Sequence, residues 1–296
     1  KETALMLPQE NIEKSNHITI DRAIFDSCTA DNNKCFYLLL ETKINIVFQN
    51  SVIKNHQSTG VDNYIGTLSF KETSVSLENI SFIDNVCDSL YGGGIGVRFI
   101  ELDSLIFLNC KFINNMAKQN KEKSRPSING IDYYNGDGGA IQLGYICKMN
   151  DMNVQFEGCD FINNKAIRHG GALAIQTYYM VKIEKCSFEN NIANYKPSSS
   201  ELLYGNYFNL KSDGRGGAIY LTLAFSYDAQ DNCQPPELPM KNIDILRCDF
   251  KSNDSYDGYA LYIDGDNPEA LFSIKTNTFI DNSNKKASDK KWQWIK

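Results

Sequence analysis

The chain has 296 residues, of which 42% are hydrophobic and 22% charged, a composition that supports a buried core and excludes wholesale disorder. Its 30 basic and 36 acidic residues give a net charge of -6, which argues against a nucleic-acid-binding protein. There is no run of 18 or more apolar residues, so we expect no transmembrane helix. Asparagine occurs 32 times, which indicates a structural use of this side chain.

The first segment in chain order, residues 1–19, begins KETALMLPQE and has no signal-peptide pattern. We interpret it as an N-terminal cap or linker of a processed chain or of a region of a longer one. Residues 20–282 then carry a repeated block in which Phe is followed three positions later by Asn. Six copies are clear: ISFIDN (80–85), CKFINN (110–115), CDFINN (159–164), CSFENN (186–191), CDFKSN (248–253) and NTFIDN (277–282). Residues 283–296 are predicted to be a polar tail.

Two degenerate copies are predicted to precede these six. They are CTADNN (28–33) and NSVIKN (50–55), with Ala30 and Val52 in the place of Phe. A second block follows the marker Phe of the first by 8 to 10 residues where nothing is inserted, and it reads GGGI (92–95), GGAI (138–141), GGAL (170–173), GGAI (216–219) and GYAL (258–261). Alternating or continuous apolar runs rich in β-branched and aromatic residues adjoin both blocks, which predicts strands rather than helices.

A unit of 22 to 30 residues with two or three short strands, repeated about eight times, is typical of a parallel β-solenoid. We predict an all-β, single-stranded, right-handed parallel β-helix (a pectin-lyase-like solenoid) of about nine coils. Stacked coils place equivalent side chains above one another. The predicted ladders contain Phe82, Phe112, Phe161, Phe188, Phe250 and Phe279; Asn85, Asn115, Asn164, Asn191, Asn253 and Asn282; and Cys110, Cys159, Cys186 and Cys248, with Cys28. We expect the ladder asparagines to adopt the left-handed backbone conformation, and the Gly pairs to supply positive φ and close backbone approach.

The FxxN and GGA[I/L] repeats together resemble the passenger regions of the polymorphic outer membrane proteins, a family of autotransporter adhesins, and of related protist surface proteins. The resemblance covers roughly residues 20–282 and implies a β-helix displayed at a cell surface. The family's C-terminal membrane barrel has no counterpart up to the final KKWQWIK, so export by a barrel of this chain is not expected.

Longer spacings between blocks locate three insertions. Two of them, residues 117–136 and 193–215, are predicted to leave the same corner with one coil between them, and a third, near residues 226–240, leaves another corner. The first two are rich in aromatic and adaptable polar residues, as recognition loops are, although they are equally consistent with tolerated surface excursions. Their candidate binding residues are Tyr133, Tyr134, Tyr195, Tyr204, Tyr207 and Phe208.

The ladder cysteines are expected to be free, buried thiols, because parallel Cβ vectors would strain a disulfide. Four further cysteines, Cys35, Cys87, Cys147 and Cys233, lie off the ladder, and a pair of these could be oxidised in a secreted protein. No CxxC pair occurs, so we expect no zinc site. If the source is eukaryotic, Asn79 is the better glycosylation candidate of two sequons, because the second, at Asn253, is a ladder position that should be buried.

Two features could belong to a carbohydrate-cleaving β-helix: Arg168-His169-Gly170, and the acid pair Asp264 and Asp266, which could bind calcium. His169, however, occupies a variable place before a Gly pair, and residues 264–267 read as a polar turn. We therefore expect no catalytic residue and no metal or other cofactor.

The function expected from the sequence is a non-enzymatic, secreted or surface-displayed binding or adhesion module that uses its side loops. Its partner would be a protein or glycan on a cell surface or within an assembly, with no nucleic acid bound and no direct membrane insertion. A structural scaffold in a larger assembly is the alternative, and a polysaccharide lyase or hydrolase is the second alternative.

Overall fold

The structure of the whole chain is a computed structural model. It describes residues 17–27, 29–31, 45–60, 70–71, 74–89, 95–97, 99–100, 104–118, 137–143, 153–176, 180–193, 214–222, 243–256, 258–264, 272–282 and 292–295. Over these residues the chain forms strands and turns and no helix. Every strand pair is parallel, and each sheet is built from successive turns of the chain, which makes the fold a parallel β-helix.

Two eight-stranded sheets run the length of the solenoid. Sheet A contains β1 (His17–Asp21), β4 (Asn45–Gln49), β8 (Ser74–Glu78), β13 (Ser104–Leu108), β17 (Asn153–Glu157), β21 (Met180–Glu184), β25 (Ile243–Leu246) and β28 (Phe272–Lys275). Sheet B contains β2 (Ile24–Asp26), β5 (Val52–Lys54), β9 (Ser81–Ile83), β14 (Lys111–Ile113), β18 (Asp160–Ile162), β22 (Ser187–Glu189), β26 (Asp249–Lys251) and β29 (Thr278–Ile280).

Two six-stranded sheets and one short pair complete the coils. Sheet C contains β3 (Thr29–Asp31), β6 (Gln57–Gly60), β10 (Val86–Ser89), β15 (Met116–Ala117), β19 (Lys165–Ala166) and β23 (Ile192–Ala193). Sheet D contains β11 (Ile95–Val97), β16 (Ile141–Leu143), β20 (Leu173–Gln176), β24 (Ile219–Thr222), β27 (Leu261–Asp264) and β30 (Trp292–Ile295). The short pair joins β7 (Phe70–Lys71) to β12 (Phe99–Ile100).

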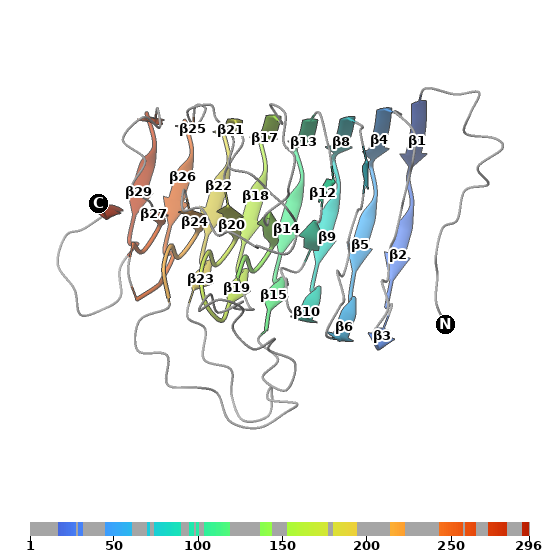
Figure 1. Cartoon of the computed structure of the whole chain (residues 1–296), viewed down its shortest axis with the longest axis horizontal. Helices are drawn as coiled ribbons and strands as arrows, with labels where there is room; N and C mark the ends of the chain where they lie inside the picture. Colours follow the sequence, from blue (N-terminus) through green and yellow to red (C-terminus); the bar gives the residue numbers. More distant parts are fainter. Residues whose placement is uncertain are drawn as a thin grey trace, which may run out of the picture.

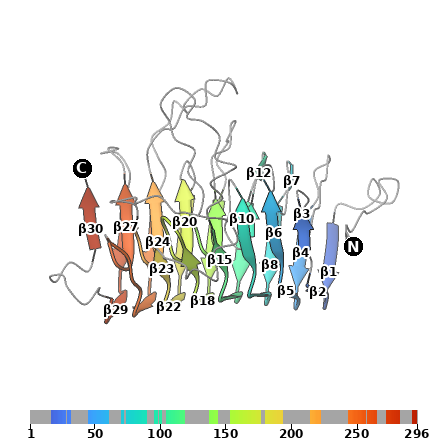
Figure 2. The same ribbon diagram turned by 90° about the horizontal axis from the view of Figure 1, so that it is seen from below.

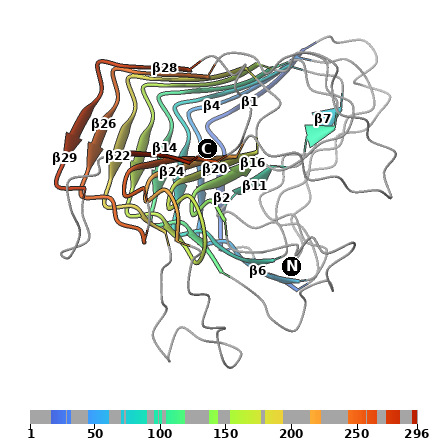
Figure 3. The ribbon, with the colours of Figure 1, turned by 60° about the vertical axis from the view of Figure 1, so that its left-hand side comes forward.

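The strands stack in chain order along the long axis, with β1 and β29 at opposite ends (Figure 1). The view turned by 90° shows the same order from β1 to β30 (Figure 2). Sheets A and B meet at a corner, and sheet D forms a separate layer of the coil (Figure 3). The described residues hold eight coils, counted in sheets A and B, so the predicted total of about nine is not confirmed. The hand of the winding stays a prediction.

Left-handed backbone marks three corners of the coil. Between sheets A and B it falls on residues such as Asn79 (φ 53°), and between sheets B and C on residues such as Asn114 (φ 56°). The third corner precedes sheet D and uses the first glycine of each described pair, for example Gly170 (φ 62°). The second glycine of the pair allows the predicted close approach of backbones, because a Cβ at Gly171 would lie 2.1 Å from the carbonyl oxygen of Gly217. Both predicted uses of the Gly pair are therefore present, one at each glycine.

The predicted asparagine ladder is a continuous chain of amides, buried from Asn85 to Asn253 and partly buried at Asn282. The Nδ2 group of Asn115 donates to the Phe82 carbonyl at 3.0 Å and to Asn164 Oδ1 at 3.0 Å, while its own Oδ1 accepts from Asn85 Nδ2 at 2.9 Å. The same pattern continues to Asn282. Each amide from Asn85 to Asn253 thus has both N–H groups and its oxygen satisfied inside the protein, which removes the penalty of burying it.

The prediction that these asparagines adopt left-handed backbone is wrong. The left-handed residue is the preceding one, two positions after Phe, as at Asn114, Asn163 and Asn190. Those side chains point outward and lie at the exposed surface of the turn. The turn must be made before the ladder position, because the ladder side chain then points into the solenoid, where its amide reaches the neighbouring coils.

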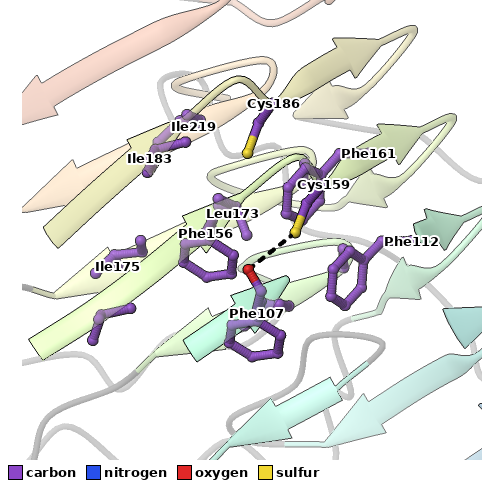
Figure 4. Close-up of a cluster of buried hydrophobic side chains, with 14 of the residues drawn as sticks. Phe107, Phe112, Phe156, Cys159, Phe161, Leu173, Ile175, Ile183, Cys186 and Ile219 are labelled. Carbon is purple, nitrogen blue, oxygen red and sulfur yellow. Dashed lines mark hydrogen bonds between the residues drawn. The ribbon is translucent and has the colours of Figure 1, made fainter. Parts of the chain in front are cut away.

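The phenylalanine ladder lies directly behind sheet B. Neighbouring rings from Phe82 to Phe279 are stacked with centroids 4.7 to 4.9 Å apart and nearly parallel planes. The first five are buried, and Phe279 is partly buried at the end. A second stack, which was not predicted, joins Phe107 and Phe156 of sheet A, whose ring centroids lie 4.7 Å apart. Its rings contact those of the first ladder edge-on (Figure 4).

The two degenerate copies are in a different register from the predicted one. Ile53, not Val52, pairs with Phe82, and Phe25, not Ala30, pairs with Ile53. The first spacings between markers become 28, 29 and 30 residues, which is more regular than predicted. In this register His56, three residues after Ile53, takes the position of the ladder Asn. Ala23, two residues before Phe25, takes the cysteine-ladder position that was predicted for Cys28. Cys28 itself lies outside the described residues.

The remaining cysteine ladder consists of free thiols, as predicted. Cys110, Cys159, Cys186 and Cys248 are buried in consecutive coils, and Cys110 Sγ lies 3.2 Å from the Leu77 carbonyl oxygen, an oxygen of the preceding coil. The Cys110 thiol and burial raise the pKa of Cys159, and burial with the Cys159 thiol raises that of Cys186. Raised pKa values disfavour the reactive thiolate.

The boundaries of the solenoid differ slightly from the predicted ones. Strand β1 begins at His17, before the predicted start at residue 20. Strand β30, at residues 292–295, pairs with β27 although it falls within the predicted polar tail. The pattern Trp-x-Trp-Ile has the alternation of the other sheet D strands, which is the signal that was missed.

We predict that Phe161→Ala lowers the free energy of unfolding by on the order of 3–5 kcal/mol. Its ring lies 4.7 Å from both Phe112 and Phe188, and two stacked rings held by their own coils cannot close the cavity. Urea denaturation followed by circular dichroism measures the change. Ile162→Ala, a truncation on the outward face of the same strand, is the matched control. An equal loss in the two variants would contradict the ladder register.

We predict that His56→Asn stabilises the first coils by about 0.5–1.5 kcal/mol, because an Asn can donate where the buried imidazole does not. Neither ring nitrogen of His56 makes a hydrogen bond of ordinary geometry, although the Phe25 carbonyl lies near enough to favour the protonated ring, and the side chain is 3% exposed. Burial lowers the pKa of His56 below its usual 6.5, against the opposing influence of the Phe25 carbonyl and Asp26.

The lowered pKa of His56 gives the pH dependence its sign. Below pH 6.5 His56 is protonated in the unfolded chain but stays neutral in the folded chain down to a lower pH. The free energy of unfolding is therefore unaffected by His56 above pH 6.5 and decreases as the pH falls below this value. Melting curves between pH 5 and 8 should therefore show a smaller acid loss in His56→Asn than in the wild type. Parallel pH profiles for the two proteins would overturn this account of His56.

Candidate functional site

The candidate site is the corner between sheets C and D where the first two insertions begin and end. The first insertion follows β15 and returns at Asp137, and the second follows β23 and returns at Gly214. Strand β19 lies between β15 and β23 in sheet C. The structure therefore places the ends of both insertions at one corner, with one coil between them. Their predicted binding residues, Tyr133, Tyr134, Tyr195, Tyr204, Tyr207 and Phe208, lie outside the described residues.

The intervening coil passes this corner without an insertion, through residues 167–170. Its backbone is tied to the returning ends of both insertions. The Gly138 N–H donates to the His169 carbonyl at 2.8 Å, and the Gly170 N–H donates to the Arg215 carbonyl at 2.9 Å. Asp137, His169 and Arg215 therefore occupy the same place in three consecutive coils.

A buried charge pair links the first insertion to this intervening coil. Asp137 is 7% exposed, and its Oδ1 accepts a hydrogen bond from the His169 N–H at 3.1 Å. Its Oδ2 lies 3.6 Å from Nη1 of Arg168, which is 9% exposed. Burial raises the pKa of Asp137, and Arg168 and the His169 N–H offset this only in part.

An aromatic row links the intervening coil to the second insertion. The His169 ring stacks on Tyr220 with centroids 4.4 Å apart, and Tyr220 lies 5.8 Å from Tyr262 of the next coil. The guanidinium carbon of Arg215 lies 5.1 Å from the Tyr262 ring centroid, within the range of a cation–π contact. Tyr220 and Tyr262 are in register on adjacent strands β24 and β27, and Tyr262 is fully buried.

Sequence reasoning identified His169 but missed the contacts around it. The signal was available in the Gly blocks, because Gln142, Ala174, Tyr220 and Tyr262 all follow the block directly. Their shared register places them in one row on sheet D. The pairing of Asp137 with Arg168 gave no such signal, since it joins different positions of two coils.

Of the two candidate catalytic features, only Arg168 with His169 lies wholly among the described residues. Arg168 and His169 are both buried, and His169 is 4% exposed. Asp264 ends strand β27, and Asp266 lies outside the described residues. Among the residues that can be described, no three His, Cys, Asp or Glu side chains are grouped as metal ligands would be.

The glycosylation candidate Asn79 lies on an exposed turn with positive φ, and its Nδ2 donates to Asn50 Oδ1 at 3.2 Å. The second sequon residue, Asn253, is fully buried, and its Nδ2 is bonded to the Phe188 carbonyl and to Asn282. Exposure thus favours Asn79 over Asn253 as an acceptor. Its modification stays a prediction.

Comparison with known proteins identifies one repeat of the solenoid. Residues 185–222 match the family model of the Chlamydia polymorphic membrane protein repeat. This match covers β22 to β24, with the second insertion between its Phe and Gly blocks. Searches of curated proteins and of solved structures found no match to the chain.

None of the residues that the structure describes forms a helix long and apolar enough to cross a membrane.

Proposed function

We propose that the protein is a surface-displayed binding module, adhesive in function, that presents its first two insertions to a partner from one corner of the solenoid. The observation that carries the proposal is that the two insertions begin and end at one corner with a single coil between them, and that Asp137, at the returning end of the first insertion, contacts Arg168 and His169 of this coil. The match of residues 185–222 to a polymorphic membrane protein repeat supports display at a cell surface.

The spacing of the insertions supports a joint binding surface. Adjacent parallel strands lie about 4.8 Å apart, so insertion bases two coils apart are separated by roughly 10 Å. A specific interface buries on the order of 800 Å² per partner, which is more than a single short loop usually offers. Two aromatic-rich insertions at this distance can form one continuous surface for a protein or glycan on a cell.

We predict that binding is lost when residues 118–136 and 194–214 are each replaced by an Asn-Gly turn. The coil stack keeps its ladders, so far-UV circular dichroism should be unchanged. Fluorescently labelled protein is tested on epithelial cell monolayers and on a printed glycan array. Replacement of residues 226–240, the third insertion at another corner, is the matched control and should keep binding.

The loop experiment also separates this proposal from the alternatives. Unchanged binding after both replacements would contradict a role for this corner. Absence of binding by the wild-type chain to cells and glycans, together with its incorporation into an assembly, would favour the structural scaffold instead.

We further propose that the protein carries out no catalysis. Arg168 and His169 are buried in contacts with Asp137 and Tyr220, which leaves them engaged structurally. General acid–base cleavage of a glycoside needs two carboxyl groups held on either side of the bond. We predict no reducing ends or unsaturated products after incubation with uronate-containing and neutral polysaccharides, with and without calcium. Turnover that is lost in Arg168→Ala or Asp266→Ala would make the protein an enzyme.

A further inference from the structure

We propose that the outward face of sheet B is a self-association surface, through which two copies of the chain form an antiparallel dimer. This face belongs to another side of the coil than the corner between sheets C and D. The inference therefore goes beyond the proposed binding function and does not depend on it. The strands of the face can be followed from β2 to β29 in Figure 1.

The centre of this face is a row of three isoleucines. Ile83, Ile113 and Ile162 pair in register on the neighbouring strands β9, β14 and β18. Each follows a buried phenylalanine of the ladder, so its side chain points away from the core, and each is partly exposed. Single apolar side chains on a surface are ordinary, whereas adjacent ones in register form a patch that favours contact with another molecule.

Two ion pairs flank the isoleucines on the same line of side chains. On the N-terminal side come Lys54 and then Asp26, whose charged groups lie 3.1 Å apart. On the C-terminal side come Glu189 and then Lys251, whose charged groups lie 2.9 Å apart. All four side chains are at least 34% exposed. Along the solenoid the line is thus negative, positive, apolar, negative and positive.

This order of charges is complementary to a second copy turned end for end. A two-fold axis at Ile113, parallel to the strands, places Lys54 opposite Glu189 of the second copy. The same axis places Asp26 opposite Lys251 of the second copy, and both contacts occur twice by symmetry. The isoleucines then face one another at the centre, where water is excluded.

Other arrangements of the two faces oppose like charges. A shift of one coil in one direction would place Lys54 opposite Lys251, and a shift in the other direction would place Asp26 opposite Glu189. With the two solenoids parallel, each charged residue would face its own counterpart. Charge complementarity therefore selects a second copy as the partner, in one orientation and one register.

The other outward row of sheet B is compatible with this dimer. It carries Lys111 on the strand at the axis, and Lys111 pairs in register with Asp160 on the next strand. Each Lys111 thus has a carboxylate on a neighbouring strand of its own copy and another across the interface. Packed sheets lie about 10 Å apart, a distance that a Lys and an acidic side chain can span together.

The size of the face predicts a weak dimer. Eight strands about 4.8 Å apart, each with a width of about five residues, give a contact of roughly 500 Å² per copy. Stable complexes bury on the order of 800 Å² per partner, and smaller interfaces are typical of transient association. We therefore expect a dissociation constant in the micromolar range, which sedimentation velocity can measure.

The test exchanges the charges within each ion pair of the full chain and measures association by sedimentation velocity at about 1 to 200 µM. The first variant combines Asp26→Lys with Lys54→Glu, and the second combines Glu189→Lys with Lys251→Glu. Each variant keeps an ion pair within its own chain but opposes like charges across the dimer. We expect each variant alone to associate about tenfold more weakly than the wild type, or weaker still.

An equimolar mixture of the two variants should associate again, because every facing pair is then of opposite sign. Glu157→Lys combined with Lys185→Glu is the matched control, because it exchanges an exposed ion pair whose carboxylate lies on sheet A. This control should associate as the wild type does. Ile113→Asp is an independent variant that places two like charges at the axis, and it should also weaken association about tenfold.

Several outcomes would overturn the inference. A wild type that is monomeric at the highest concentration would leave this face to a different partner. Association of either exchange variant alone, or of Ile113→Asp, at wild-type strength would place the dimer contact elsewhere. A mixture that stays monomeric, or a control that is weakened equally, would also contradict the proposed register. If an exchange variant does not fold by circular dichroism, the result for Ile113→Asp decides.

Discussion

The buried asparagine amide is the contact on which the remaining structure depends. Its oxygen accepts from one neighbouring coil while its Nδ2 group donates to both the next Asn and a Phe carbonyl, so no other uncharged side chain of this length can replace it. Aspartate lacks the donors, and leucine would leave those backbone carbonyls without a partner. The ladder therefore fixes the register of each coil on the last, and the phenylalanine stack behind it follows that register.

This constraint explains how the solenoid tolerates its insertions. Asn115 and Asn164 are 49 residues apart, and Asn191 and Asn253 are 62 residues apart, yet their amides bond at 3.0 and 2.9 Å, as amides in coils without insertions do. The cost of closing a longer loop grows only slowly with its length. Sequence can therefore be added at a corner while the neighbouring coils stay in register. The repeat therefore keeps the coils in register, and the first two insertions both occur at the corner between sheets C and D.

The sequence predicted most of the frame because the frame is periodic. The Phe, Asn and Cys positions, the strands and the roles of the Gly pairs could all be read from recurring letters. The prediction was wrong where the residue types change but the geometry does not. Ile53 and Phe25 continue the Phe ladder, although the residues around them led to another register. Trp292–Ile295 forms a strand after the last recognised block. The left-handed turn was assigned one residue too late, since in three of the six clear copies two adjacent asparagines stand there and sequence does not distinguish their backbones.

The candidate site was predicted less completely because its contacts are not periodic. The location of the insertions follows from spacing alone, and the structure places their ends where the spacing predicts. The charge pair of Asp137 and Arg168 joins different positions in adjacent coils, so no repeat reveals it. The stacking of the His169 ring on Tyr220 could not be predicted either, because Tyr220 follows an insertion. Non-repeating residues therefore carry what is specific to this protein, in contrast to the ladders.

Hydrogen exchange of the asparagine side chains tests the ladder most directly. Nuclear magnetic resonance can follow the Nδ2 groups of Asn115, Asn164 and Asn191 beside those of the outward Asn114, Asn163 and Asn190. Buried amides with both N–H groups bonded should exchange only when the coils open, and therefore orders of magnitude more slowly than the outward ones. Equal exchange in the two sets would contradict a solenoid held in register by its inner amides.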